Sequence, residues 1–382
     1  MRLLADLATL LTICGLAAVT AGAIAVQCFA VRTVGTARRR PAVTVLKPLC
    51  GDEPLLETAL ASICGQIYPT FQIIFGVQDA SDPALATVRQ MQRRFPACDI
   101  AVVVDGRFHG PNRKISNLMN MMLMARYDVL VFSDSDLHVS PYYLEQIVAA
   151  LEVPEIGLVT TLCIGLPTSA GLAGQLGATG ISHSFLPGAL LSRALGREDC
   201  LGTTMALRRD TLASIGGLDA LVRHLADDNV MAQRVRQLGL SVGLAGTVPM
   251  TAVPETSLRA LWQHELRWAR TIRALEPMLF ATSTLQFPLF WAVVALALNG
   301  GSAWSGVLFA TAWAARAAAA RWTDRALFED WRPVVAAPVW LLPFRDIISV
   351  GQVAASYFGA RVVWRGHVMH ADDGRNSMLT RV

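Results

Sequence analysis

Two apolar regions flank a long stretch of mixed polarity. The stretch from residue 3 to residue 31 is interrupted only by Asp6 and Gln27, and it is long enough to cross a bilayer as a helix. Arginines at 32 and 38–40 follow, and the positive-inside rule places such residues on the cytoplasmic side. A cleaved signal peptide is the competing interpretation, but only one basic residue precedes the apolar run. We expect residues 1–35 to form a retained transmembrane anchor.

Between residues 36 and 276 short apolar runs alternate with amphipathic segments. The strands expected here are 43–46, 72–77, 100–104, 129–132 and 202–207. The helices expected here are 55–66, 83–94, 114–125, 141–151, 210–215, 227–238 and 262–275. Ser140 is the expected N-cap of the fourth helix, and Asp210 that of the fifth. Between 156 and 197 many glycines obscure the pattern. Alternating strands and helices predict an α/β domain with a mostly parallel, Rossmann-like sheet covered on both faces.

The chain becomes apolar again after residue 276. Met278–Leu298 and Ala303–Ala320 have the length of two transmembrane helices. A further apolar segment, 334–360, is interrupted by Pro343 to Asp346, and we expect it to form a broken or re-entrant hairpin. That arrangement keeps the arginines at 361, 365 and 375 on the cytoplasmic side. Residues 277–382 are therefore expected to be a membrane region with a short basic tail.

Composition supports a membrane protein. Hydrophobic residues make up 53% of the chain, charged residues 16%, and the mean hydropathy is +0.42. The net charge of +4 is not gathered into basic blocks, so a nucleic-acid partner is not expected. The 7 cysteines form no Cys-x-x-Cys pair, which argues against a zinc or iron–sulfur site and suits a reducing compartment. We expect a multi-pass protein of the inner (cytoplasmic) membrane with its soluble domain in the cytoplasm.

A pair of aspartates follows the apolar run at 129–132. In an extended chain Asp134 and Asp136 would project to the same side from the carboxyl end of a strand, where open α/β sheets bind ligands. Two carboxylates suit Mg²⁺ or Mn²⁺, and such an ion can bind a diphosphate. A turn with two solvated acids is the alternative, because Asp-x-Asp is common by chance.

Other charged residues lie near expected strand ends or helix starts. Asp79 follows a strand, Asp227 and Asp228 open a helix, and Arg267 lies just before the membrane region. Taken singly, each has a structural explanation: Asp79 as a turn residue, Asp227 as a helix cap and Arg267 as an interfacial anchor. Their order along the chain carries more information than any one of them.

That ordered set resembles the inverting, nucleotide-sugar-dependent glycosyltransferases with a GT-A fold, of the family 2 and 21 type. The similarity is greatest to the ceramide glucosyltransferase branch. The motifs that carry it are Val77-Gln78-Asp79, Asn112 to Met119, Ala125 to Asp128, Ser133-Asp134-Ser135, Met205 to Leu212, Gly216-Gly217-Leu218, Leu225 to Asp228 and Arg267-Trp268. The stretch 262–271 is similar to bacterial glycosyltransferases of hopanoid biosynthesis.

The resemblance implies a role for each matching residue. Asp79 would bind the uracil or ribose of a UDP-sugar, with Lys114 and Asn117 near the nucleotide. Asp134 and Asp136 would bind a divalent metal (Mg²⁺ or Mn²⁺), and Asp228 would be the general base. The remaining roles implied are contacts to the diphosphate or acceptor by Arg267 and Trp268, and acceptor-side positions for His183, Asp227 and His264.

Two of these positions depart from the family pattern. His264 stands where Gln or Arg is usual, and Asp227 where Glu is usual. Eukaryotic ceramide glucosyltransferases also tend to lack the second acid of the metal pair, which makes Asp134 the better supported ligand.

The function implied is transfer of one sugar from a UDP-sugar to a lipid hydroxyl. We expect N-acetylglucosamine transfer to bacteriohopanetetrol, with glucose transfer to ceramide as the alternative. A processive polysaccharide synthase would require more spans, and a non-catalytic scaffold would not require the acids at 79, 134 and 228.

Overall fold

The computed structural model describes residues 1–31, 37–327, 338–359, 361–364 and 367–370. The chain divides into two compact units. The helical unit comprises the described residues within 1–32, 165–197 and 253–373, and the sheet unit comprises those within 33–164 and 198–252. The expected domain limits at residues 35 and 276 stay predictions.

The sheet unit is built on a seven-stranded sheet with the order β3-β2-β1-β4-β8-β6-β9. Its strands are β1 (Val43–Pro48), β2 (Phe71–Val77), β3 (Asp99–Val104), β4 (Val129–Ser133), β6 (Ile156–Thr160), β8 (Thr204–Arg208) and β9 (Ser241–Leu244). All neighbours run parallel except β8, which is antiparallel to both β4 and β6. The mostly parallel α/β sheet predicted from the sequence is confirmed. The strand order reverses next to β1, and such switch points are where open α/β sheets bind ligands.

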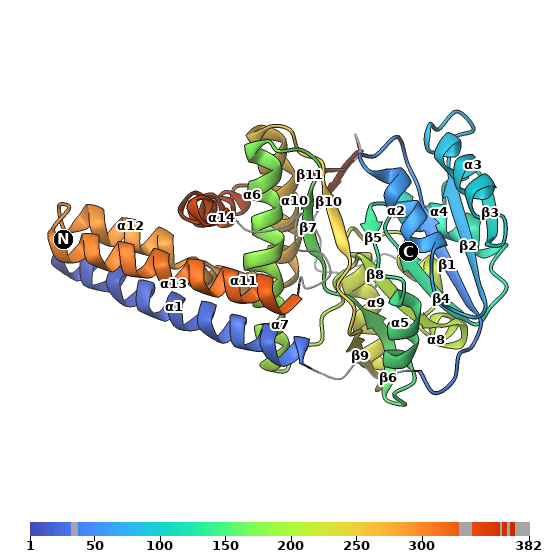
Figure 1. The fold of residues 1–382 in the computed structure, drawn as a ribbon, viewed down its shortest axis with the longest axis horizontal. Helices are drawn as coiled ribbons and strands as arrows, with labels where there is room; N and C mark the ends of the chain where they lie inside the picture. Colours follow the sequence, from blue (N-terminus) through green and yellow to red (C-terminus); the bar gives the residue numbers. More distant parts are fainter. Residues whose placement is uncertain (32–36, 328–337, 360, 365–366, 371–382) are drawn as a thin grey trace, which may run out of the picture. The chain divides into compact units, whose positions relative to one another are not determined.

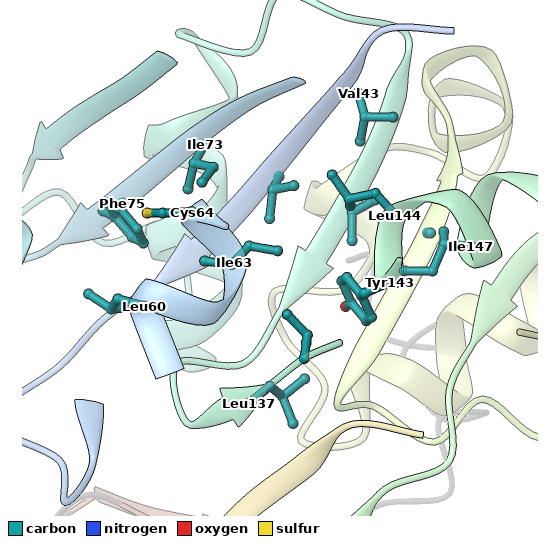
Figure 2. Packing of buried hydrophobic residues seen from close by; sticks show 14 of the residues in the cluster. Val43, Leu60, Ile63, Cys64, Ile73, Phe75, Leu137, Tyr143, Leu144 and Ile147 are labelled. Atoms are coloured by element: carbon teal, nitrogen blue, oxygen red, sulfur yellow. The ribbon is translucent and has the colours of Figure 1, made fainter. Parts of the chain in front are cut away.

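Helices cover both faces of this sheet. One face carries α2 (Leu56–Cys64), α3 (Ala84–Arg94) and α5 (Tyr143–Leu151), and the other carries α4 (Arg113–Met122), α8 (Arg209–Ser214) and α9 (Asp227–Gln237). The layers arise because side chains alternate along each strand. In β2, Ile73 and Phe75 pack on the first face and Ile74 on the second. Figure 2 shows the first face, where Leu60 and Ile63 of α2 approach the sheet.

Two predicted helix caps are wrong. The helix expected from 141 begins at Tyr143, because Ser140 and Pro141 are used elsewhere: their carbonyls accept hydrogen bonds from Gln66 and Ile67. Asp210 lies inside the first turn of α8, whose cap position is Arg208.

The glycine-rich stretch is regular, contrary to its loose sequence pattern. It contains β6, β7 (Ile164–Pro167), α6 (Leu172–Gly180), a π-helix (Ile181–Phe185) and α7 (Leu186–Ala194). Its glycines at 165, 177 and 180 permit close packing rather than turns. A Cβ at Gly177 would lie 2.7 Å from Val253 Cγ1, and one at Gly180 would lie 2.9 Å from Arg345 Cζ. These contacts explain glycines within a helix, where they normally weaken it.

In the helical unit α1 (Arg2–Ala30) packs along α12 (Pro288–Leu298) and α13 (Ala303–Leu327), as Figure 1 shows. A second group consists of α6, α10 (Leu258–Leu275) and α14 (Leu342–Ser356). The shorter elements of the chain are β5 (Leu137–His138), β10 (Met250–Val253), β11 (Arg361–Trp364), β12 (His367–His370), α11 (Pro277–Thr282) and the 3₁₀ turns Leu218–Ala220, Ser283–Gln286 and Val339–Leu341.

Among the residues that the structure describes, α1 is the one helix that is long and apolar enough to cross a membrane by itself, with a mean hydropathy of 2.1 over an 18-residue window. Pro277–Gln286 and Pro288–Leu298 meet the criterion together but are bent by 70°. The C-terminal spans expected at 278–298 and 303–320 are thus not shown. Pro343 lies in the first turn of α14 and does not interrupt a helix. Residues 334–337 and the arginines at 365 and 375 lie outside the described residues.

Candidate active site

The expected metal pair lies in a turn between β4 and β5. β4 ends at Ser133, so Asp134 and Asp136 do not continue an extended strand, which corrects the geometry expected from the sequence. The two carboxyl groups nevertheless interact. Burial and then the charge of Asp134 raise the pKa of Asp136 to about 6, although the Thr251 hydroxyl donates a hydrogen bond to it at 2.6 Å.

Lys114, in the first turn of α4, connects the aspartate turn to the loop before β8. Its Nζ lies 2.6 Å from Asp134 Oδ1 and 3.3 Å from the carbonyl oxygen of Gly202. Burial alone would lower the pKa of Lys114, but the charges of Asp134 and Asp227 outweigh it and raise the pKa. The lysine is therefore a fixed cation among acids.

Asn112 sets the position of Lys114 by joining the starts of two helices. Its Oδ1 caps α4 by accepting a hydrogen bond from the Ile115 amide at 3.1 Å. Its Nδ2 donates to Asp227 Oδ1 at 3.0 Å and to the His224 carbonyl at 2.8 Å. The first turns of α4 and α9 are thus held together, although Asn112 and Asp227 are 115 residues apart.

Asp228 occupies the start of α9. Burial and the neighbouring charge of Asp227 raise the pKa of Asp228 to about 7. Its Oδ1 accepts a hydrogen bond from the Asn229 amide at 2.8 Å. Gly202 has a φ of +77°, and a Cβ there would lie 2.7 Å from Asp228 Oδ2. The structure therefore brings Asp134, Lys114 and Asp228 together around one glycine.

Asp79 follows the end of β2, and Asn117 of α4 contacts that strand end, but the two residues differ in exposure. Asp79 is exposed, and hydrogen bonds from the Ser81 amide (2.8 Å) and hydroxyl (2.7 Å) lower its pKa. Asn117 is buried, and its Nδ2 donates to the Gly76 carbonyl at 2.8 Å. Its Oδ1 is buried and has no hydrogen-bond partner among the residues that the structure describes. Asn117 thus supports the strand end that carries Asp79.

Sequence reasoning missed two charged residues next to the aspartate turn. Lys47 lies near the end of β1, and its Nζ donates to Ser133 Oγ at 3.2 Å. Burial lowers the pKa of Lys47 to about 8, against the charges of Asp136 and Asp134. Glu53 accepts a hydrogen bond from the Ser135 hydroxyl. The sequence feature that could have indicated Lys47 is its position directly after the apolar run 43–46.

Three expected site residues lie in the helical unit, on α10. His264 Nδ1 is hydrogen-bonded to Glu255, and the His264 and Trp268 ring centroids are 4.5 Å apart. Trp268 is 40% exposed, so its ring remains available to a ligand. Arg267 lies one residue before it, and its carbonyl accepts a hydrogen bond from the Thr271 hydroxyl. Glu255, which the sequence did not suggest, is thus the partner of the unusual His264.

His183 lies in the π-helix of the helical unit. Its side chain is almost fully buried, and its Nε2 lies 2.6 Å from Asp324 Oδ1. Within the described part of the chain, its buried Nδ1 has no hydrogen-bond partner. π-Helical turns are often found at functional sites. The acceptor-side role expected of His183 stays a prediction.

A metal site built from protein alone is not present in the described part of the chain, where no group of three or more His, Cys, Asp or Glu side chains is arranged around a common point. Mg²⁺ usually takes only one or two protein carboxylates together with substrate phosphates and water. Asp134 and Asp136 supply that number. The raised pKa of Asp136 also indicates a carboxyl pair that an added cation would stabilise.

The fold is that of a GT-A-type glycosyltransferase. The structure is similar to a mannosyltransferase from Pyrobaculum calidifontis, solved in complex with GDP-Man and Mn²⁺, with a TM-score of 0.51, 20% sequence identity, and coverage of 92% of this chain and 99% of that one.

The family follows from the sequence comparison. The model of glycosyl transferase family 21 matches residues 10–377, and the chain belongs to that family. It is 23% identical over 252 residues to ceramide glucosyltransferase 1 of Caenorhabditis elegans, covering 64% of this chain and 53% of that protein. It is 27% identical over 302 residues to the ceramide glucosyltransferase of Komagataella phaffii, covering 63% and 59%. The chain thus spans somewhat more than half the length of these relatives. The predicted ceramide glucosyltransferase-like family is confirmed.

Proposed function

We propose that this protein transfers one glucose from UDP-glucose to the hydroxyl of a ceramide-type lipid, with inversion at the anomeric carbon. The observation that carries the proposal is the convergence of Asp134, Lys114 and Asp228 at the switch point of the sheet. Family membership and the named activity of the ceramide glucosyltransferase relatives support glucose and ceramide. The sequence favoured N-acetylglucosamine and bacteriohopanetetrol, and the comparisons give that pair no support.

Asp228 acts as the general base. It accepts the proton of the acceptor hydroxyl while that oxygen attacks the anomeric carbon, and the sugar–phosphate bond breaks on the opposite face. UDP then leaves with the electron pair of that bond. A base with a pKa of about 7 is well matched to this role, because it is substantially ionised at neutral pH and still accepts a proton readily.

Lys114 and the aspartate turn receive the diphosphate. The Lys114 ammonium group offsets the charge that develops on UDP as it leaves. Asp134 and Asp136 would hold Mg²⁺ or Mn²⁺, which supplies Lewis-acid stabilisation of the leaving diphosphate. Asp227 keeps Lys114 in place through Asn112 and its own charge, so we assign it a positioning role.

The remaining assignments follow the family pattern. Asp79, exposed at the end of β2, binds the uracil or ribose, and buried Asn117 supports that strand end. Arg267 and Trp268 bind the diphosphate or the acceptor. His264 holds the Trp268 ring through their contact, and His183 lies on the acceptor side.

The helical unit lies in a bilayer. Helix α14 buries its polar residues Arg345, Asp346 and Gln352, whereas Phe344 and Ile347 are 58% and 41% exposed. A helix of a water-soluble protein has the opposite arrangement. In lipid the outer surface is apolar and polar groups face the protein interior. We therefore infer that α14 faces lipid.

Helix α1 shows a related pattern. It buries small residues, among them Gly15 and Gly22, and exposes Leu3 and Leu10. Small residues let membrane helices approach closely, and a Cβ at Gly15 would lie 2.5 Å from the Leu285 carbonyl oxygen. These faces support a multi-pass protein of the inner membrane, with the sheet unit in the cytoplasm.

The test uses purified protein in detergent with Mg²⁺ or Mn²⁺. UDP-glucose and UDP-N-acetylglucosamine are each offered with ceramide and with bacteriohopanetetrol, and the glycolipid is followed by mass spectrometry. We expect glucosylceramide from the natural chain and none from Asp228→Asn. Product only from N-acetylglucosamine and bacteriohopanetetrol would replace our substrates with the hopanoid pair. Long polymer would indicate a processive synthase, and UDP-sugar binding without any product would contradict the proposal for these acceptors.

A further inference from the structure

Lys47 is a buried cation directly beneath the aspartate turn. Its side chain has no exposed surface. Besides the bond to Ser133 Oγ at 3.2 Å, its Nζ donates to the backbone carbonyl of Asp134. A buried ammonium group is costly unless it is hydrogen-bonded and compensated by negative charge. The surroundings of Lys47 provide both.

Three acids supply the compensating charge. Asp136, Asp134 and Glu53 all act electrostatically on Lys47. Glu53 is in turn held by the Ser135 hydroxyl, so the acid on the loop after β1 and the aspartate turn form one cluster. The cluster therefore encloses the ammonium group of Lys47.

The lysines of this chain are few and lie at one place in the fold. Of its 33 lysines and arginines only two are lysines, Lys47 and Lys114, and both contact Asp134. Their contacts differ: Lys114 binds the Asp134 carboxylate, whereas Lys47 donates to the Asp134 backbone carbonyl. An ammonium group is a compact point charge that fits where a guanidinium would not. Lys47 thus engages the backbone of the turn and leaves the Asp134 carboxylate to Lys114.

We propose that Lys47 is the built-in counter-cation of the aspartate turn, and that its charge prevents Asp134 and Asp136 from retaining a divalent metal until a nucleoside diphosphate is bound. The inference rests on the proposed function. A dipositive ion next to Lys47 is repelled, and the two carboxylates are already partly neutralised. The diphosphate brings additional negative charge and oxygen ligands, so metal and nucleotide bind together. Lys47 is a positioning residue, because it acts through its contacts with Ser133 and the Asp134 backbone.

The test measures Mn²⁺ binding rather than turnover. Free Mn²⁺ is quantified by electron paramagnetic resonance, with purified protein in detergent, with and without UDP. The natural chain should bind Mn²⁺ weakly alone and much more tightly with UDP. Lys47→Met removes the charge, and we expect Mn²⁺ binding without UDP to tighten by about tenfold or more because the repulsion is lost. The enhancement by UDP should shrink accordingly.

Lys47→Gln separates charge from support of the turn, because its amide retains a donor. Both neutral variants should tighten Mn²⁺ binding, and adding Asp134→Asn or Asp136→Asn should abolish that gain. Unchanged or weaker Mn²⁺ binding in both variants, with thermal unfolding as in the natural chain, would overturn this inference and leave the proposed function standing. Failure of the natural chain to bind UDP with Mn²⁺ would overturn both.

Discussion

Gly202 lies directly against the Asp228 carboxyl group, and a Cβ at position 202 would be 2.7 Å from Asp228 Oδ2. The glycine also has a φ of +77°, and its carbonyl oxygen accepts a hydrogen bond from Lys114. One backbone position therefore fixes the distance between the proposed base and the proposed phosphate-binding lysine.

Gly202→Ala should displace Asp228. We expect kcat to fall by about 10²-fold, because a displacement of about 1 Å in a catalytic group has that effect. Gly239→Ala is the matched control, since Gly239 has the same φ of +77° and a Cβ added there would meet nothing within 4 Å. Backbone strain is then common to both variants. Equal loss of activity in the two would show that strain, and not contact with Asp228, is responsible.

The pH dependence of the reaction should follow the ionisation of Asp228. Its pKa is raised to about 7, so the group is protonated and inactive as a base below that pH. We expect kcat/KM to rise about tenfold per pH unit below pH 7 and to level off above it. The measurement is a pH profile of initial rates with a short-chain acceptor. A profile that is flat between about pH 5 and pH 8 would exclude Asp228 as the base.

Lys114→Met should weaken donor binding. The change leaves Asp134 and Asp227 without their shared cation. Lys114 and Asp134 form a partly buried pair, with 17% and 32% of their side chains exposed, and loss of its cation should weaken UDP binding by about tenfold or more. UDP binding measured by calorimetry is the readout. Arg113→Met is the control, because the Arg113 guanidinium lies over the Phe108 ring, 4.6 Å from its centroid, and not on Asp134. Similar UDP affinity in the two variants would contradict the role of Lys114.

Glu265 and Arg345 should be tightly coupled in stability. Arg345 Nη1 lies 2.8 and 2.9 Å from the two Glu265 carboxylate oxygens, and Gln352 donates a further bond to Glu265. All three side chains are buried, so Arg345→Met should lower the free energy of unfolding by about 3–5 kcal/mol.

Comparison with a surface pair makes that prediction specific. Arg94 and Glu57 are 3.6 Å apart and about half exposed, and Arg94→Met should cost at most about 1 kcal/mol. Replacing Glu265 and Arg345 together by Met should restore much of the loss, since neither charge is then left unpaired. Additive losses in the double variant, measured by denaturant unfolding in detergent, would show that the pair is not coupled.

The sequence predicted the central strands well because their patterns are local. The run 129–132 is apolar and ends in polar residues, and β4 is Val129–Ser133. The same holds for 72–77 and β2. The stretch 156–197 was not predicted, because several of its glycines are explained by contacts with distant residues, as Gly180 is by Arg345. Periodicity within a segment carries no information about such contacts.

The sequence suggested which residues belong to the candidate site, but not which of them contact one another. Motif order pointed to Asp134, Lys114 and Asp228. Nothing in the spacing indicates that Asn112 bonds Asp227 or that Gly202 lies against Asp228, since those pairs are distant in the chain. Lys47 was overlooked because a lysine at the end of an apolar strand usually indicates solvent, whereas here it is enclosed.

The orientation of α14 reverses the usual rule of surface engineering for this protein. A water-soluble version could not be made by replacing the charged residues of that helix, because Arg345 and Asp346 are buried against the rest of the protein. The positions open to redesign are the aromatic and aliphatic ones, Phe344 and Ile347, which are exposed. On the proposed placement of α14 in lipid, a redesign that keeps every apolar residue would leave the helix unsuited to water, whereas exchanging the exposed Phe344 and Ile347 would make it compatible with water.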